Sequence, residues 1–219
     1  MSIAENLDKI KSEIPSTVKL VAVSKTKPVQ VILEAYRAGH KIFGENKVQE
    51  MVEKYPLLPK DIEWHHIGHL QTNKVKYIAA FVSLIHAVDS LNLLQEINKQ
   101  AIKNNRIIDC LLQIHIAREQ TKFGLSFEEA EIILRSGEVL KLKNINIIGL
   151  MGMATNTDDP GQIRNEFHKL KTFFDKLIAY HFQLSTLSMG MSGDYKIAME
   201  EGSTIIRIGS LIFDEGVLN

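Results

Sequence analysis

Two cationic residues beside apolar segments could act together on a carbonyl compound. Lys25 follows the segment LVAVS, which begins at Leu20, and Arg207 lies within TIIRIG, which begins at Thr204. A lysine amine beside apolar residues is less strongly solvated than one in open water, and such an amine is a good nucleophile toward aldehydes. A lysine at a strand end can also extend into solvent with no chemical role, so its neighbours must decide.

Two short turns near Arg207 have the composition of an anion site. The turn Gly190-Met191-Ser192-Gly193 follows one apolar segment, and Gly209-Ser210 directly follows the segment that contains Arg207. Small residues allow backbone N–H groups to approach an anion such as a phosphate closely. Either turn alone is equally compatible with an ordinary structural role.

Eight apolar segments rich in Val, Ile and Leu alternate with segments of helical periodicity. The predicted strands begin at Leu20, Lys41, Glu63, Leu84, Asp109, Ile145, Leu184 and Thr204. Their nearly continuous apolar character is typical of parallel strands that are buried on both faces. In 219 residues without a linker, this alternation predicts an α/β fold: a single (β/α)8 TIM-type barrel domain over residues 1–219. A doubly wound open sheet is the alternative.

The intervening segments contain helix signals. Gly39 is a predicted C-cap, and Ser126 with Glu129 has the spacing of a capping box. Apolar residues between 163 and 177 predict the longest helix. The chain begins with an amphipathic segment, residues 3–14, which predicts an added N-terminal helix that packs on the outer wall of the barrel.

The barrel prediction brings the candidate residues together. Active sites in this fold lie at the C-terminal ends of the strands, and closure places strand eight beside strand one. Arg207 and Gly209 then lie next to Lys25. An aldehyde that also carries a phosphate describes pyridoxal 5′-phosphate (PLP), which proteins usually hold through a lysine Schiff base. An arginine near its pyridine nitrogen keeps that nitrogen unprotonated, which favours mild chemistry or mere carriage.

The composition disfavours several other classes of protein. Lys and Arg number 26, as do Asp and Glu, so no net charge attracts nucleic acid or an anionic membrane. The chain has no apolar run long enough to span a bilayer and no signal peptide pattern. Its single cysteine, Cys110, is predicted to be a core residue. We therefore expect a cytoplasmic protein, and a barrel without an added domain is expected to be a monomer.

Six segments of the chain together resemble one known family. AVSKTKP, FGEN, WHHIGHLQTNK, GLM, LSMGMSGD and GSTIIRIG occur in the order and spacing found in the pyridoxal phosphate homeostasis proteins, the YggS/PROSC family. The similarity extends from about residue 18 to residue 213. It implies a fold like the barrel domain of alanine racemase, that is, fold type III among PLP proteins.

The resemblance implies roles for particular residues. Lys25 carries the Schiff base, Asn46 lies beside the ring, and Arg207 approaches the pyridine nitrogen. The residues implied to hold the phosphate are Ser192, Gly209 and Ser210, and those implied to line the mouth are Met189 and His66 or His69. Two positions depart from the family pattern: His115 stands where an asparagine is expected, and Asp214 replaces a glycine. No metal site is expected, because the histidines near His66 have no completed ligand spacing.

Three functions are compatible with a lysine and a phosphate site in a barrel. The resemblance implies a non-catalytic PLP carrier that delivers the cofactor to apoenzymes. A PLP-dependent racemase also needs a base on the opposite face of its substrate. Alanine racemase takes this base, a tyrosine, from a second domain that this chain has no residues to build. The third function, a Schiff-base aldolase acting on a sugar phosphate, would leave the protein colourless.

Overall fold

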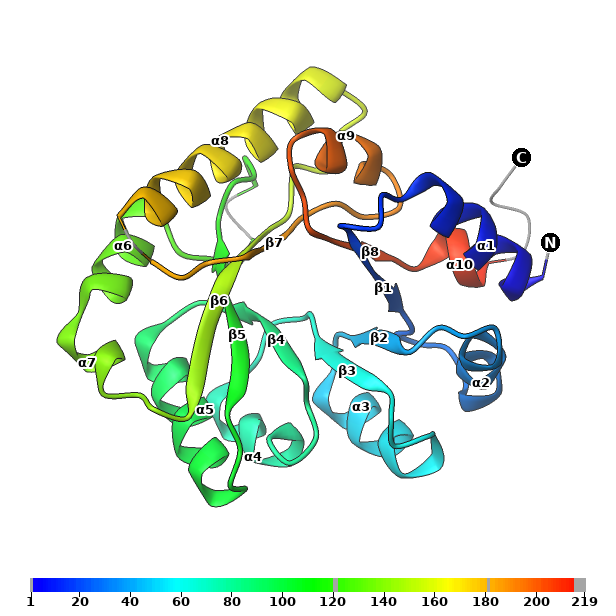
Figure 1. The fold of residues 1–219 in the computed structure, drawn as a ribbon, viewed down its shortest axis with the longest axis horizontal. Helices are drawn as coiled ribbons and strands as arrows, with labels where there is room; N and C mark the ends of the chain where they lie inside the picture. The colour runs from blue at the N-terminus through cyan, green and yellow to red at the C-terminus, as the bar shows by residue number, and fades with distance from the viewer. Residues whose placement is uncertain (1, 120–121, 181, 215–219) are drawn as a thin grey trace.

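Eight parallel strands form the centre of the molecule (Figure 1). The computed structural model describes residues 2–119, 122–180 and 182–214. The strands are β1 (Lys19–Val23), β2 (Ile42–Glu45), β3 (Glu63–His66), β4 (Leu84–Val88), β5 (Ile108–Ile114), β6 (Ile145–Gly152), β7 (Thr186–Ser188) and β8 (Ile205–Ile208). Each pairs with the next in chain order, and β8 pairs with β1 to close the barrel. The predicted barrel is confirmed, and the open sheet is wrong.

The helices surround this barrel (Figure 1). They are α1 (Ile3–Glu13), α2 (Val29–Arg37), α3 (Val48–Lys54), α4 (Val75–Ile78), α5 (Leu91–Lys103), α6 (Phe127–Arg135), α7 (Gly137–Leu140), α8 (Pro160–Ala179), α9 (Tyr195–Glu200) and α10 (Ser210–Phe213). Two 3₁₀ turns, η1 (Tyr55–Leu57) and η2 (Thr72–Lys74), precede β3 and α4. The capping box of Ser126 and Glu129 is present at the start of α6, and Gly39 has the positive φ of 81° expected of a C-cap glycine.

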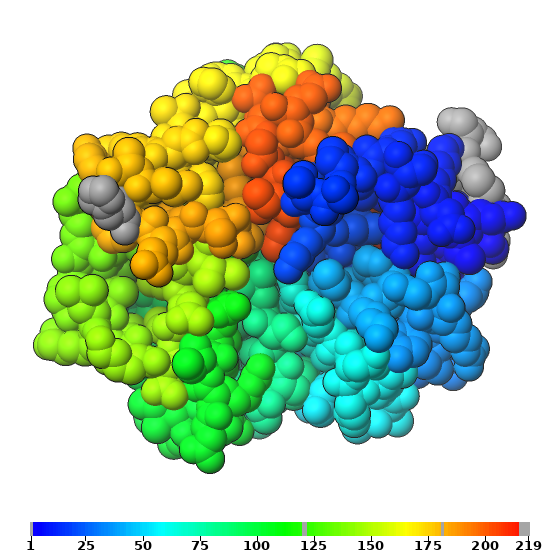
Figure 2. Space-filling view, viewed as in Figure 1, coloured from blue at the N-terminus to red at the C-terminus, as the bar shows by residue number. Residues whose placement is uncertain are grey.

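The added N-terminal helix connects the two ends of the described chain. Leu7 and Ile10 of α1 are buried, and the Asn6 side chain donates a hydrogen bond of 3.0 Å to the carbonyl of Ile212 in α10. At the end of α1, Glu13 accepts a hydrogen bond of 2.7 Å from the hydroxyl of Tyr195 in α9. Figure 2 shows the blue N-terminal segment against the orange segment that contains α9. The helix therefore supports the part of the barrel where β8 meets β1.

The apolar core has two parts. One fills the barrel itself and contains Val21, Leu111 and Met151, and the other lies between the strands and the helices and contains Trp64. Cys110 belongs to the second part, where burial raises the pKa of its thiol; its prediction as a core residue is confirmed. Within the described ranges, no helix is both long enough and apolar enough to cross a membrane.

The pairing of β6 with β7 depends on a glycine. A Cβ atom added to Gly149 would lie 1.7 Å from the carbonyl oxygen of Thr186. We therefore expect Gly149→Ala to lower the free energy of unfolding by about 1–3 kcal/mol or more, because the two strands must separate. Gly137, where an added Cβ has no atom within 4 Å, provides the control, and Gly137→Ala should change stability by less than about 1 kcal/mol. Equal stability of the two variants in urea denaturation would contradict this explanation.

Candidate functional site

A cavity of about 490 Å³ opens at the C-terminal end of the barrel. Six of the eight predicted site residues line it: Lys25, Asn46, Ser192, Arg207, Gly209 and Ser210. The rest of its lining is Val23, Thr26, Lys27, Ile67, Met153, Met191, Gly193 and Asp214. These residues come from the two ends of the described chain and from the loops that follow β2, β3, β6 and β7. Closure of the barrel therefore assembles the cavity.

The pairing of β8 with β1 sets the depth of each cationic group. Arg207 pairs with Val21, four residues before Lys25, so the arginine lies deeper in the barrel than the lysine. Gly209 follows β8, and a Cβ atom added there would lie 3.2 Å from the Val23 carbonyl oxygen. A small residue at this position therefore leaves room for the loop that carries Lys25.

A buried lysine holds the loop that presents Lys25. The ammonium group of Lys54, from the end of α3, donates hydrogen bonds of 2.8 Å to both the Ser24 carbonyl and the Glu45 carboxylate. The Ser24 hydroxyl donates to the same carboxylate at 2.6 Å. Because Lys54 and Glu45 are only 6% and 0% exposed, each needs the other as a partner. This ion pair fixes the residue that directly precedes Lys25.

A second carboxylate holds the residue that follows Lys25. Glu50 accepts a hydrogen bond of 2.5 Å from the backbone N–H of Thr26 and one of 2.6 Å from Lys54. Thr26 has a φ of 64°, which is strained for a β-branched residue. The bond from Glu50 compensates for part of this strain. Lys25 is therefore held on both sides, and it lines the cavity.

Arg207 is a buried cation that has neutral hydrogen-bond partners. Only 3% of the residue is exposed. Its guanidinium donates to the Ser188 hydroxyl oxygen at 2.6 Å and to the Gly152 carbonyl at 3.1 Å. Burial lowers its pKa to about 10, and the more distant Asp194 opposes this shift. The group therefore stays charged at neutral pH and has further N–H groups to offer to a ligand.

Free backbone donors line another part of the cavity. Ser192, Gly193 and Ser210 have N–H groups that donate no hydrogen bond to another described residue. The Asp194 carboxylate fixes the first turn by accepting a bond of 2.5 Å from the Met191 N–H. Together with the hydroxyls of Ser192 and Ser210, these donors suit the oxygen atoms of a phosphate.

Two predicted residues lie outside this cavity. His66 and Met189 are completely buried, and neither belongs to the cavity lining. Side chains of a strand alternate between its two faces. The His65 side chain forms its hydrogen bond inside the barrel, so its neighbour His66 lies on the helix side of the strand. In the same way, Ser188 points into the barrel, and the next residue, Met189, belongs to the core between strands and helices. The expectation that these two residues line the mouth is therefore wrong. The alternative candidate, His69, pairs with Asp89 at 3.2 Å instead.

Sequence reasoning also missed parts of the site. Lys27 and Asp214 line the cavity and form an ion pair of 2.5 Å across its edge. The position of Lys27 only two residues after Lys25, in the loop that follows the first strand, was the one available signal for it. His115, which departs from the family pattern, does not line the cavity. Its ring contacts the Ala117 carbonyl at 2.9 Å.

The fold and the site define a barrel of the alanine racemase class. The family model "Alanine racemase, N-terminal domain" matches residues 1–215. An alanine racemase from Clostridium difficile superposes with a TM-score of 0.81 over 96% of this chain and 56% of that chain, at 16% identity. At this identity the similarity concerns the fold alone.

More similar relatives define the family within this class. A pyridoxal phosphate homeostasis protein from Aquifex aeolicus is 45% identical over 90% of this chain and 86% of its own length. The structure of PipY from Synechococcus elongatus with PLP bound has a TM-score of 0.89 and 35% identity, and covers 97% of this chain and 100% of that chain. The chain belongs to the pyridoxal phosphate homeostasis protein family.

The stability of the protein around the loop that presents Lys25 should depend on Lys54. Burial already raises the pKa of Glu45, and Lys54 and Ser24 partly oppose that shift. Lys54→Met leaves this carboxylate buried without its cation, so we expect a loss of about 3–5 kcal/mol in stability at neutral pH. Because the variant raises the pKa of Glu45 in the folded state further, its loss of stability relative to the wild type should grow as the pH rises above the ordinary pKa of a glutamate.

An exposed ion pair provides the control for this prediction. Lys41 pairs with Asp61 at 2.6 Å, with both side chains about half exposed, so Lys41→Met should have a much smaller effect. Chemical denaturation at several pH values measures both variants. A deficit of Lys54→Met that does not depend on pH would contradict the role assigned to Glu45.

Proposed function

We propose that this chain binds PLP in the cavity at the C-terminal end of the barrel, as a Schiff base on Lys25. It serves in intracellular PLP homeostasis as a monomeric cytoplasmic carrier that delivers the cofactor to apoenzymes. The observation that carries the proposal is the shared cavity itself, which is lined by Lys25, by the buried Arg207 and by backbone N–H groups that donate no hydrogen bond to another described residue. The PLP bound to the related PipY supports the choice of ligand.

The residues of the cavity fit the chemical groups of PLP. Among the described residues, the lining contains Lys25, Lys27 and Arg207 but one carboxylate, Asp214, so the cavity favours a doubly charged phosphate. Ser192, Gly193, Gly209 and Ser210 are the residues that would hold this phosphate, and Lys25 would bind the aldehyde carbon. Asn46 would lie beside the ring.

The environment of Arg207 limits the chemistry of the site. When bound, PLP withdraws electrons from an amino group attached to its aldehyde carbon, most strongly when its pyridine nitrogen is protonated. Arg207 can only donate hydrogen bonds and keeps its charge at neutral pH. It would therefore hold the pyridine nitrogen unprotonated, and a weakened electron sink suits storage better than catalysis.

The positions of the tyrosines favour a carrier over a racemase. Tyr36 donates a hydrogen bond to Asp61, Tyr55 stacks on Phe81, and Tyr195 donates to Glu13. No tyrosine occurs among the residues that line the cavity. The one carboxylate there, Asp214, is bonded to Lys27. Lys25 thus has no opposing base in the described part of the cavity.

Lys25→Ala should abolish the covalent attachment and retain weak phosphate binding. We expect purified wild-type protein with added PLP to show a visible absorption band, and the variant to lose this band while dialysis detects residual binding that is weaker by about tenfold or more. Lys47→Ala, an exposed lysine directly after Asn46 that does not line the cavity, is the matched control and should keep the band. A band of unchanged intensity in Lys25→Ala would refute the assignment of the Schiff base.

An experiment can distinguish direct delivery of PLP to apoenzymes from release of PLP into solution. Protein loaded with PLP is mixed with a PLP-free aminotransferase, with and without a phosphatase that destroys free PLP. A carrier should reactivate the aminotransferase at nearly the same rate in both cases, because the cofactor passes between sites without accumulating in solution. Reactivation that the phosphatase abolishes would show that the protein only releases PLP, and would refute delivery.

A further inference from the structure

Three buried polar residues form a continuous line of hydrogen bonds that ends at Arg207. The guanidinium contacts the Ser188 hydroxyl oxygen at 2.6 Å, and this oxygen is 2.9 Å from Nδ1 of His86. Nε2 of His86 lies 3.0 Å from Nδ1 of His65. His86 and Ser188 are 0% exposed and His65 is 4% exposed. The line joins β8, β7, β4 and β3 through the interior of the barrel.

The donors and acceptors along this line have one arrangement that uses every group. Arginine can only donate, so the Ser188 oxygen accepts its N–H. The Ser188 hydroxyl then donates to Nδ1 of His86, which leaves the proton of His86 on Nε2. That N–H donates to Nδ1 of His65. Burial keeps both imidazoles neutral, since it lowers the pKa of His65 to about 3 and that of His86 well below its usual value.

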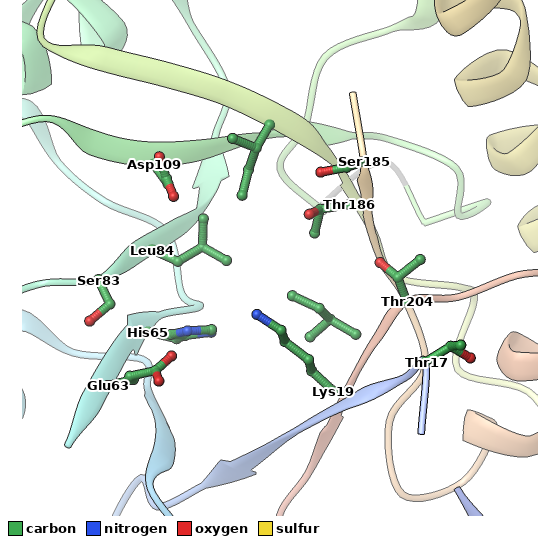
Figure 3. Close-up of a pocket in the computed structure, with 12 residues that line it drawn as sticks. Thr17, Lys19, Glu63, His65, Ser83, Leu84, Asp109, Ser185, Thr186 and Thr204 are labelled. Carbon is green, nitrogen blue, oxygen red and sulfur yellow. The ribbon is translucent and has the colours of Figure 1, made fainter. Parts of the chain in front are cut away.

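The far end of the line reaches a second cavity, at the N-terminal end of the barrel. This cavity has a volume of about 380 Å³, and His65 and Lys19 line it. Figure 3 shows the His65 ring at the wall and the Lys19 amine extending into the space. The chain of hydrogen bonds therefore runs from this cavity, through the apolar interior, to the cofactor site proposed above.

We propose that His86 and Ser188 are positioning residues for Arg207, which they hold in the orientation that meets the pyridine nitrogen of PLP. The proposal rests on the proposed function for its ligand, but the positioning itself concerns the protein alone. His65 completes the line by fixing the orientation of the His86 ring.

Arg207 needs such support because no carboxylate bonds to it among the described residues. Its orientation depends on two neutral acceptors, the Gly152 carbonyl and the Ser188 hydroxyl. The carbonyl is fixed by the strand, whereas a hydroxyl rotates freely unless its own proton is bound. His86 binds that proton and so directs a lone pair of Ser188 toward the guanidinium. Without His86, one of the two acceptors loses its orientation.

The first part of the test uses the protein without PLP. In protein labelled with ¹⁵N in the arginine guanidinium groups, the Arg207 N–H groups should exchange slowly with solvent. Ser188→Ala and His86→Leu should each increase that exchange rate by about tenfold, the effect of losing one buried hydrogen bond. His86→Asn should remain near the wild-type rate, because its side-chain oxygen can replace Nδ1 as the acceptor.

His40 provides the matched control. It is a buried histidine whose ring contacts the Ile42 carbonyl at 2.9 Å, outside the line, so His40→Leu should leave the exchange of Arg207 unchanged. If His86→Leu fails to fold, Ser188→Ala and His86→Asn still test the proposal. Exchange rates of Arg207 in Ser188→Ala equal to those of the wild type would overturn it.

The second part uses the same variants with ¹⁵N-labelled PLP. The nitrogen chemical shift of the bound cofactor should move in Ser188→Ala and His86→Leu and stay at the wild-type value in His86→Asn and His40→Leu. If the nitrogen chemical shift is the same in all variants while Arg207 exchanges faster in the PLP-free variants, the effect on the cofactor is refuted. The positioning of Arg207 by His86 and Ser188 then still holds. Failure of the wild-type protein to bind PLP would instead refute the proposed function.

Discussion

The pairing of the last strand with the first is the constraint on which the site depends. Lys25 and Arg207 are separated by most of the chain, and they share a cavity only because β8 pairs with β1 in the register that sets Arg207 against Val21. The same pairing places Gly209 against the end of β1. α1 and α10 pack over this junction, with Asn6 bonded to the Ile212 carbonyl. The two ends of the chain thus stabilise the place where the cofactor site is proposed.

Burial of charge is the second recurring feature. Lys54 is neutralised by Glu45 and Glu50, an ion pair network that holds the loop around Lys25. Arg207 is instead bonded to a hydroxyl and a carbonyl. This difference has a chemical consequence, because an arginine not neutralised by a carboxylate keeps its positive charge available to an electron-rich ring nitrogen. One buried cation therefore fixes backbone, and the other has no carboxylate bonded to it among the described residues.

Much of the fold could be predicted from the sequence, because apolar segments, capping residues and the C-cap glycine are local signals. Six of the residues that line the cavity could be predicted from strand ends and from resemblance. Met189 and His66 could not be placed, because the face that a residue occupies near a strand end depends on the register. The bonds among His65, His86, Ser188 and Arg207 join four strands, and no local pattern records which inward side chains meet across a barrel.

The most direct test of the account is to locate the attachment of PLP on the wild-type chain. The protein is incubated with PLP, reduced with borohydride, digested and analysed by mass spectrometry. We expect a single major modified peptide, with the reduced cofactor on Lys25. Modification spread over surface lysines, or none at all under conditions that saturate binding, would contradict the claim that this cavity is a PLP site.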